Sequence, residues 1–387
     1  IEYRLNSLNQ AIIIYLNLVL LFFLVFCHKI TNRTILKYIN NNRKSLFYGI
    51  LLFAHTGYLG MISTNDFFNL YVFIEISALS SYVLIVSGNN PKSLIGAFDY
   101  LIMGSIGATL ILIAIGFLLS ITGSLNILVE NYFSKNQSII LLLMFIFGIA
   151  KTAIFPVHSW LPAAMVAHYP VSSLLHAVIV VKTGLFCIYK ILLYIFGLSY
   201  LQMIFAEFNW LIFIPIVSIF YSSIKALGTD NIKKILAYST MNQLSIALLS
   251  AFMLTPKALG AAILHLVSHS FSKICLFYSM GSIYSLKKAN QIQNLHGVSK
   301  EFPLISFIIS ISSLSLIGIP IFSGFISKFS ILLAASEQNQ IIVMIVIIAS
   351  SIFSSLYLLK ILSSIYKPSL VESSVIKSLP YSMRISI

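Results

Sequence analysis

Long apolar runs constrain this sequence more than any other feature. A membrane-spanning helix needs about 20 consecutive apolar residues, and runs of that length follow one another along almost the whole chain. Charged residues make up only 9% of the sequence, whereas soluble domains carry about 25%. The composition excludes a soluble protein and predicts an all-α, polytopic membrane protein with a single membrane domain over residues 1–387. We expect eleven spans, at about 11–28, 46–64, 67–88, 97–121, 138–164, 171–196, 209–228, 238–254, 258–286, 304–336 and 341–363.

Two of the expected spans contain residues that interrupt a helix. The fifth contains Pro156 and Pro162, and the tenth contains Gly318, Pro320 and Gly324. Proline has no N–H to donate and frees a backbone carbonyl one turn earlier. Such breaks are tolerated at membrane depth only where protein or a wet cavity satisfies the backbone. We therefore expect both broken helices to lie inside the bundle.

The loop charges predict the orientation of the chain. Fourteen lysines and arginines fall on one side of the predicted spans, and three fall on the other. The basic side is expected to be cytoplasmic, together with a tail over residues 364–387. The fourteen are Lys29, Arg33, Lys37, Arg43, Lys44, Lys92, Lys233, Lys234, Lys287, Lys288, Lys300, Lys367, Lys377 and Arg384; the three are Arg4, Lys135 and Lys257.

Some charged residues of the spans have an ordinary explanation. Lys225 and Lys360 lie near cytoplasmic ends, where a long side chain can reach the interface, and we expect Lys190 to reach the opposite surface. Asp66 and Asp99 are expected at the starts of their helices, where an acid suits the helix dipole.

Five other charged residues lie deep in the predicted membrane domain. They are Lys151, Lys182, Lys273, Lys328 and a single acid, Glu75. A charge at the bilayer centre costs at least about 2.5 kcal/mol. A static buried ion pair would contribute little net stability, and one acid cannot pair with four lysines. Each break also has a lysine close by in sequence, as at the mid-membrane sites of transporters. These residues favour proton or ion movement.

A polar stripe crosses the span that contains "AAILHLVSHSFSKICLF", residues 261–277. Its members recur at helical spacing on one face: His265, Ser268, His269, Ser272 and Lys273. The stripe could serve as hydrogen-bonding glue between helices. Two imidazoles and an amine in one stripe favour a path for protons or ions.

The chain divides into two similar blocks, 46–196 and 209–363. Each has five predicted spans, and in each the fourth is broken. An odd number of spans makes the second block enter from the opposite side, which predicts an inverted repeat.

Other residue types give weaker signals. Cys27, Cys187 and Cys275 stand apart in apolar runs, and no CxxC occurs, so we expect packing roles and neither a disulfide nor a metal site. His158 is expected to bind backbone carbonyls freed at the first break, whereas His168 falls in a loop. The sequence has no nucleotide fingerprint or haem pattern, so we expect no cofactor and no redox chemistry in this chain.

Five stretches resemble one known family. They are "FFNLYVFIEISALSSYVLI", "GIAKTAIFPVHSWLPAAMVAHYPVSSLLHAVIVVKTGLF", "DNIKKILAYSTMNQLSI", "HLVSHSFSKICLF" and "GIPIFSGFISKF". They resemble the proton-antiporter-like membrane subunits, which occur in Mrp-type cation/proton antiporters and in respiratory complex I. The resemblance covers nearly the whole chain.

The resemblance implies roles for individual residues in proton translocation. Glu75 and Lys151 match a switchable ion pair, and Lys182 matches a central lysine with His176 upstream. His265, His269 and Lys273 match a polar stripe. Lys328 matches a terminal charged position where one complex I subunit has glutamate, which argues against that subunit.

The resemblance also implies an assembly. The first expectation is a cation/proton exchange subunit of an Mrp-type antiporter, most similar to its D-type subunit, which works with other membrane subunits and carries protons and Na⁺ or K⁺. The alternative is a proton-pumping subunit of NADH:quinone oxidoreductase, which would make the chain part of an enzyme. Family members normally have fourteen helices, so the first two and the last are expected to be absent, and an inactive truncated member is a third possibility. The expected location is the inner or plasma membrane of a bacterium rather than a mitochondrion, with no nucleic-acid partner.

Overall fold

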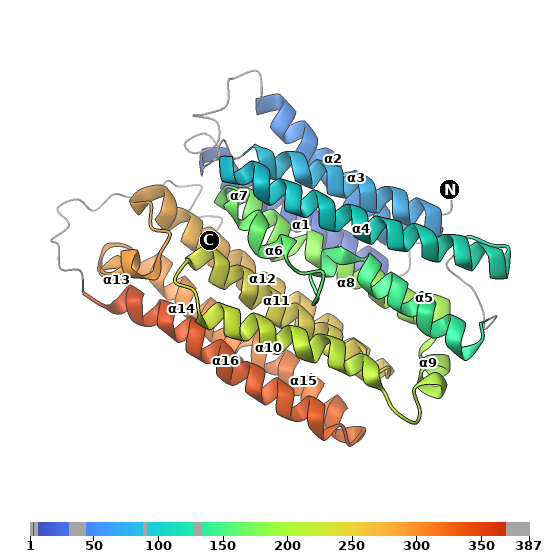
Figure 1. The fold of residues 1–387 in the computed structure, drawn as a ribbon. Coiled ribbons are helices and arrows are strands. Elements are labelled where there is room, and N and C mark those ends of the chain that lie inside the picture. The colour runs from blue at the N-terminus through green and yellow to red at the C-terminus, as the bar shows by residue number, and fades with distance from the viewer. Residues whose placement is uncertain (1–2, 4–6, 31–43, 88–90, 127–132, 369–387) are drawn as a thin grey trace.

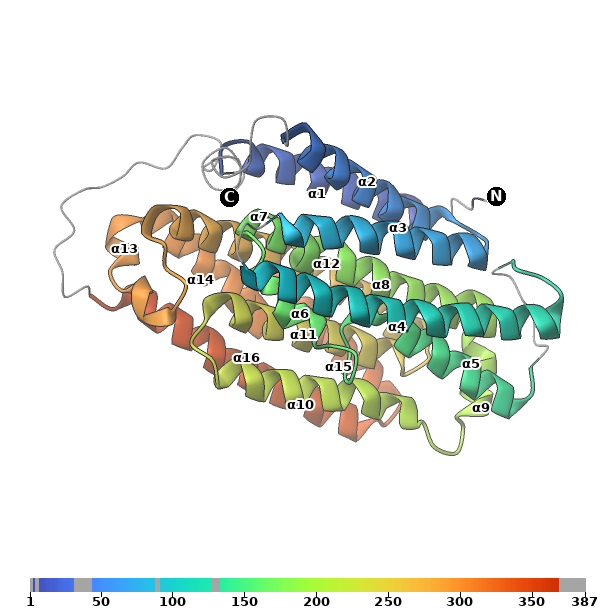
Figure 2. The same cartoon turned by 45° about the horizontal axis from the view of Figure 1, so that its top comes forward.

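The computed structural model describes residue 3 and residues 7–30, 44–87, 91–126 and 133–368 (Figure 1). Within these residues the chain is helical, with isolated β-bridges in place of any sheet. The long helices lie side by side along a common direction and form one bundle (Figures 1 and 2). The all-α prediction is therefore confirmed. Of the expected cytoplasmic tail, residues 369–387 lie outside the described part.

The long helices are separated by short ones and by tight turns. The α-helices are α1 (Ser7–Ile30), α2 (Lys44–Ser63), α3 (Phe67–Val86), α4 (Pro91–Thr122), α5 (Lys135–Gly148), α6 (Trp160–Ala163), α7 (Tyr169–Ser172), α8 (Val180–Lys190), α9 (Leu198–Ile204), α10 (Phe213–Leu227), α11 (Ile232–Ala251), α12 (Pro256–Lys287), α13 (Val298–Glu301), α14 (Pro303–Ile317), α15 (Ser323–Glu337) and α16 (Ile341–Tyr366). The 3₁₀ segments are η3 (Ala150–Thr152), η4 (Ala164–Val166), η7 (Trp210–Ile212) and η8 (Ile292–Leu295), and the π-helical segments are η5 (Ser173–Val178) and η6 (Ile191–Phe196).

Seven helical stretches among the described residues are long and apolar enough to cross a membrane. They are Ser45–Ser63, Phe67–Val86, Pro91–Thr122, Tyr169–Phe196, Trp210–Leu227, Pro256–Lys287 and Ile341–Tyr366. The other expected spans coincide with helices that are shorter, more polar or interrupted: α1, α5, α11 and the pair α14 and α15. The positions of the spans agree with the sequence, and the count of eleven stays a prediction.

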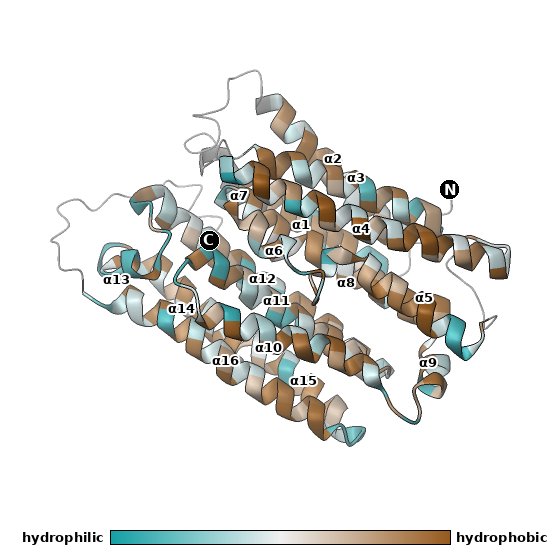
Figure 3. Ribbon diagram, viewed as in Figure 1, coloured by the Kyte–Doolittle hydropathy of each residue, from teal (hydrophilic) through white to brown (hydrophobic). Residues whose placement is uncertain are grey.

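Two groups of helices meet at a buried centre. Helices α2, α3, α4 and α5 pack in sequence order, and α10, α11 and α12 pack with α14, α15 and α16. Between the groups, α8 contacts both α2 and α11, and all its residues are buried. Hydrophobic residues, in brown, make up much of the long helices in Figure 3. Many large hydrophobic side chains are exposed, as suits surfaces that meet lipid. The bundle thus encloses the helices that carry the polar residues.

The two acids expected at helix starts behave differently. Asp66 is the N-cap of α3, and its carboxylate accepts a hydrogen bond from the backbone N–H of Asn69 at 2.8 Å. The expectation for Asp99 is wrong, because α4 already begins at Pro91 and Asp99 lies on its exposed face. The apolar pattern misplaced this start because the first turns of α4 are more polar than its middle.

Of the three lysines near helix ends, two are exposed and one is buried. Lys225 is exposed, and Lys360 reaches out to Asp230 at 2.7 Å, as expected. The expectation that Lys190 reaches a surface is wrong: it is buried, and its Nζ donates to the carbonyls of Ile62 at 3.2 Å and Thr64 at 2.6 Å. The end of α2 has carbonyls without helical partners, and they hold this ammonium inside the bundle.

We expect Lys190→Met to destabilise the protein by about 1–3 kcal/mol, because buried carbonyls at the end of α2 lose a donor. The midpoint of thermal unfolding in detergent measures the effect. Lys135→Met, at an exposed position on α5, should leave the midpoint unchanged. Equal midpoints for the two variants would mean that Lys190 does not hold α2.

Candidate functional site

The first break begins earlier than the prolines suggest. Helix α5 ends at Gly148, and Lys151 lies in the following 3₁₀ turn η3. Ala153, directly after η3, has a left-handed φ of 53°. Pro156 follows a cis peptide bond. The expectation that Pro156 interrupts the helix is therefore wrong, because the helix has already ended at Gly148. Gly148 packs too closely for any other residue, since a Cβ there would lie 2.7 Å from Cγ1 of Ile111 on α4.

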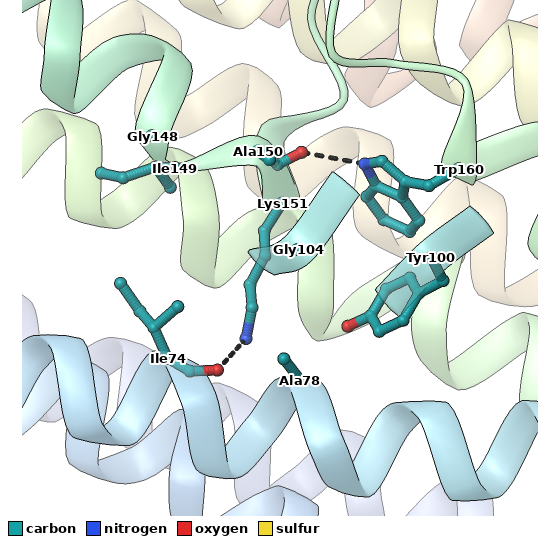
Figure 4. Close-up of a pocket in the computed structure, with 9 residues that line it drawn as sticks. All are labelled: Ile74, Ala78, Tyr100, Gly104, Gly148, Ile149, Ala150, Lys151 and Trp160. Atoms are coloured by element: carbon teal, nitrogen blue, oxygen red, sulfur yellow. Dashed lines mark hydrogen bonds between the residues drawn. The ribbon is translucent and has the colours of Figure 1, made fainter. Parts of the chain in front are cut away.

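Trp160 satisfies the backbone at this break. Its indole N–H donates to the carbonyl of Ala150 at 2.9 Å (Figure 4). His158, which was expected to bind backbone carbonyls here, is hydrogen-bonded to the backbone of Pro156. Its ring also stacks on Phe155 and meets Tyr221 edge-on, with the His158 and Tyr221 ring centroids 4.4 Å apart. The backbone N–H of Phe155 donates to Ser218 Oγ at 2.8 Å. Trp160 carried no signal in the sequence, because its role depends on how α6 folds back.

Lys151 points from η3 toward α3. Its Nζ donates to the carbonyl of Ile74 at 2.9 Å (Figure 4). It also donates to Ser77 Oγ. Glu75 lies between these two residues in sequence, and its Oε1 is buried without a hydrogen-bond partner among the described residues. The electrostatic influence of Glu75 reaches Lys151, yet the two form no ion pair here. Sequence reasoning found both charges but missed Ser77.

Helix α8 passes directly behind Lys151. A Cβ on Gly184 would lie 3.0 Å from Cβ of Lys151, so only glycine lets the two segments approach this closely. Two residues earlier, Lys182 is buried, and its Nζ has no hydrogen-bond partner in the described part of the chain. His176 falls in η5, and its side chain lies outside the described residues.

The polar stripe of α12 faces other helices of the bundle. His265 Nδ1 lies 2.9 Å from Ser327 Oγ of α15, and Lys273 Nζ donates to the carbonyl of Leu236 of α11 at 3.0 Å. Both ring nitrogens of His269 are buried without a partner among the residues described. His269 lies within electrostatic range of Lys182, Lys273, His265 and Lys328. It therefore lies among the buried basic side chains of this part of the bundle.

The second break lies where the sequence predicts it. Helix α14 ends at Ile317, and Gly318 follows with a φ of 92°, a value that favours glycine. Lys328 of α15 turns back to the break, where its Nζ donates to the carbonyls of Leu316 and Ile317, both at 2.9 Å, and to Ser351 Oγ at 3.1 Å. A Cβ on Gly318 would lie 3.0 Å from Cδ of Lys328. Pro320 falls between α14 and α15, and Pro162 lies in the short helix α6.

The structure thus brings the expected site residues into two neighbouring clusters. Glu75 and Lys151 form the first, around α3 and η3, and the second joins α8, α12 and α15 through Lys182 and the residues of the stripe. The basic members are 0–7% exposed. They are Lys151, Lys182, His265, His269, Lys273 and Lys328.

Known proteins are similar to this chain in sequence. The family described as NADH:quinone oxidoreductase/Mrp antiporter, transmembrane region, matches residues 64–354. NADH-quinone oxidoreductase subunit N of Desulforudis audaxviator is 31% identical over 332 residues, which are 83% of this chain and 64% of that protein. The D-type subunit of the Na⁺/H⁺ antiporter of Bacillus subtilis is 28% identical over 316 residues, 80% of this chain and 63% of that protein.

A solved structure agrees. A chain of the Mrp complex from Dietzia sp. DQ12-45-1b superposes with a TM-score of 0.77 at 26% identity, covering 86% of this chain and 63% of that one. The chain therefore spans less than two thirds of the length of these relatives. The resemblance seen in the sequence is confirmed, and the chain belongs to the family of NADH:quinone oxidoreductase and Mrp antiporter membrane subunits.

Proposed function

We propose that this chain is a proton-translocating subunit of a multisubunit Mrp-type cation/proton antiporter, with protons carried by its buried basic side chains. One observation carries the proposal: the six buried Lys and His side chains of the two clusters lie in one membrane domain with Glu75 as the deep acid. Permanent charges on the four lysines would cost far more than packing could return, at about 2.5 kcal/mol or more each. Groups that gain and lose protons in turn avoid that cost.

Lys151 is the proposed first carrier. Its present acceptors, the Ile74 carbonyl and Ser77 Oγ, lie on the same helix as Glu75, so a modest swing would bring the ammonium to the carboxylate. In the paired position Glu75 holds the proton on Lys151. In the separated position seen here, the neutral acceptors hold it less strongly. Alternation between the two positions makes Lys151 a proton switch.

A small cavity beside Lys151 supports hydration of the switch. Its volume is about 20 Å³, and Ile74, Tyr100, Ala150 and Trp160 contribute to its walls (Figure 4). A cavity of about 10–15 Å³ suffices for one water molecule when polar partners are present. The carbonyl of Ile74 and the Lys151 ammonium are such partners, so a water here could pass a proton.

His269 is the proposed relay of the second cluster. Lys182 and Lys273 are both buried and lie within electrostatic range of each other, and two ammonium charges at such a range would repel. His269 lies within range of both lysines and has two ring nitrogens that no described residue binds. An imidazole can accept a proton on one nitrogen and release it from the other. The proposed order is Lys151, Lys182, the stripe of α12 and then Lys328.

The two breaks support an inverted repeat over 46–196 and 209–363. In each block the fourth predicted span is interrupted, and a lysine near the interruption donates to backbone carbonyls: Lys151 to Ile74, and Lys328 to Leu316 and Ile317. Broken helices in equivalent halves are typical of transporters with alternating access. By the charge bias, the basic side faces the cytoplasm of a bacterium.

The partners follow from the relatives. We infer other membrane subunits of an Mrp-type assembly, with Na⁺ or K⁺ exchanged for protons. A second candidate is a pumping subunit of NADH:quinone oxidoreductase, which the 31% identity to subunit N favours. Co-purification separates them, because only the second would bring hydrophilic iron–sulfur subunits. A truncated, inactive member would show no proton exchange in any assembly.

Replacing Lys151 tests the proposal most simply. Both Lys151→Ala and Lys151→Arg should lower proton exchange by at least about 100-fold, the scale of a lost proton-transfer group. Arginine fails because it keeps its proton. A pH-sensitive dye in vesicles that contain the full assembly measures the exchange. Lys135→Arg, an exposed lysine of α5, is the matched control and should be active. Normal exchange by Lys151→Arg would show that Lys151 is a fixed charge.

Replacing the stripe histidines tests the relay. The double variant His265→Ala, His269→Ala should insert at the normal level yet lose most proton exchange, because Lys182 and Lys273 then lack an intermediate carrier. His296→Ala, in the loop after η8, is the control and should exchange protons normally. Wild-type proton exchange by the double variant would show that the stripe histidines serve only in helix packing and carry no protons.

A further inference from the structure

A second, polar pocket lies away from the proton path. Its volume is about 470 Å³, and it lies among the start of α4, the loop before α7, the start of α11 and the end of α12. Lys92, Lys233, Lys234 and His168 line it, together with Tyr284 and Asn290. Lys92, Lys234 and Asn290 are exposed, so the pocket is open to the surface at one end of the bundle.

The lining is positively charged. Three lysines contribute to it, and none of its lining residues is an acid. A fourth lysine, Lys288, lies 5.1 Å from the ring of Tyr284 at the same edge. The nearby acid Asp230 is engaged at 2.7 Å by Lys360. The residues that line the pocket therefore carry a net positive charge.

The position of two lysines makes this excess more unusual. Lys233 and Lys234 lie in the first turn of α11, just after the N-cap Asn231, which accepts a hydrogen bond from the backbone N–H of Lys234 at 3.2 Å. The N-terminus of a helix carries partial positive charge, so lysines there are unfavourable and an anion is favourable. An anion in the pocket would be attracted both by the lysines and by the partial positive charge at the start of α11.

The pocket is held in shape before any ligand binds. Lys233 Nζ donates to the carbonyl of Ala167 at 2.5 Å and lies 4.3 Å from the ring centre of Tyr169. The floor is fixed by a β-bridge between Asn231 and Gln291, with the N–H of Ile232 donating to the carbonyl of Asn290 at 3.0 Å. A site that is already ordered loses less entropy when it binds.

His168 supplies a neutral hydrogen-bonding group to the same pocket. Burial, with the positive charges of Lys233 and Lys288, lowers its pKa to about 4, so the imidazole is uncharged at neutral pH. Its Nε2 is buried and has no partner among the residues described. A neutral imidazole can donate one N–H to an oxygen, which suits a phosphate with several acceptor oxygens.

The pocket lies at the basic ends of the helices, where the headgroups of one leaflet would be. We propose that it binds the phosphate group of an anionic phospholipid. Basic pockets between membrane helices on the cytoplasmic side are suited to such headgroups. The apolar faces of α4 beside the pocket, with Leu94, Ile95 and Phe98 exposed, would accommodate the acyl chains.

Binding of defined lipids to the complete protein tests the proposal. The protein is freed of lipid in a neutral detergent, and native mass spectrometry measures dissociation constants for dioleoylphosphatidylglycerol and dioleoylphosphatidylcholine. The test variant is Lys92→Gln, Lys234→Gln. Each lysine near a membrane surface contributes about 1 kcal/mol, so the phosphatidylglycerol constant should rise about 25-fold, since about 1.4 kcal/mol is tenfold. Phosphatidylcholine should bind more weakly than phosphatidylglycerol throughout.

The control removes the same charge from the same side. Lys300 and Lys367 are exposed and do not line the pocket, so Lys300→Gln, Lys367→Gln should leave phosphatidylglycerol binding within about twofold of wild type, because contacts outside the site carry little energy. Equal weakening by both double variants would overturn the proposal in favour of a diffuse basic surface. Tighter binding of inorganic phosphate than of phosphatidylglycerol would assign the pocket to a soluble anion instead. Loss of partner subunits with unchanged lipid binding would assign it to an acidic protein segment.

Discussion

The interaction on which the site depends is that between a buried lysine ammonium and backbone carbonyls inside the bundle. An ammonium removed from water needs acceptors, and the end of a helix offers carbonyls that no helical N–H occupies. At the second break α14 ends, and Lys328 takes the carbonyls of Leu316 and Ile317. The carbonyls at the end of α14 give the Lys328 ammonium its acceptors, and the ammonium gives these carbonyls a donor. Such neutral acceptors hold a proton-bearing group without fixing its charge as a carboxylate would.

The breaks show how far the sequence predicts the fold. Gly318 and Pro320 correctly mark the end of α14, because a residue with a left-handed φ ends a helix locally. Pro156 misleads, since α5 ends at Gly148 through close packing on α4 and through the indole of Trp160. The hydropathy pattern likewise shows that Lys190 interrupts an apolar run, but it does not show that the carbonyls of Ile62 and Thr64 accept its hydrogen bonds. Local chemistry is readable in the sequence, whereas contacts between distant segments are not.

The same limit applies to the site. The sequence identifies Lys151, Lys182 and the α12 stripe because charge inside an apolar run is conspicuous. It does not reveal that Ser77 receives Lys151, since serines are common in these helices and their register against η3 is a tertiary property. Nor does it reveal that His269 lies within electrostatic range of four basic side chains. Family resemblance supplied the pairing of Glu75 with Lys151, and the structure shows the separated arrangement.

The central claim is that Lys151 alternates between Ser77 and Glu75. A double-mutant cycle of Ser77→Ala and Glu75→Gln, read as proton exchange by the full assembly in vesicles, tests it most directly. Without Ser77, Lys151 should remain longer on Glu75 and exchange should slow. With Glu75 already neutralised, the loss of Ser77 should have almost no further effect, which gives a coupling above about 0.5 kcal/mol. Effects of the two substitutions that simply add, within about 0.5 kcal/mol, would contradict the account.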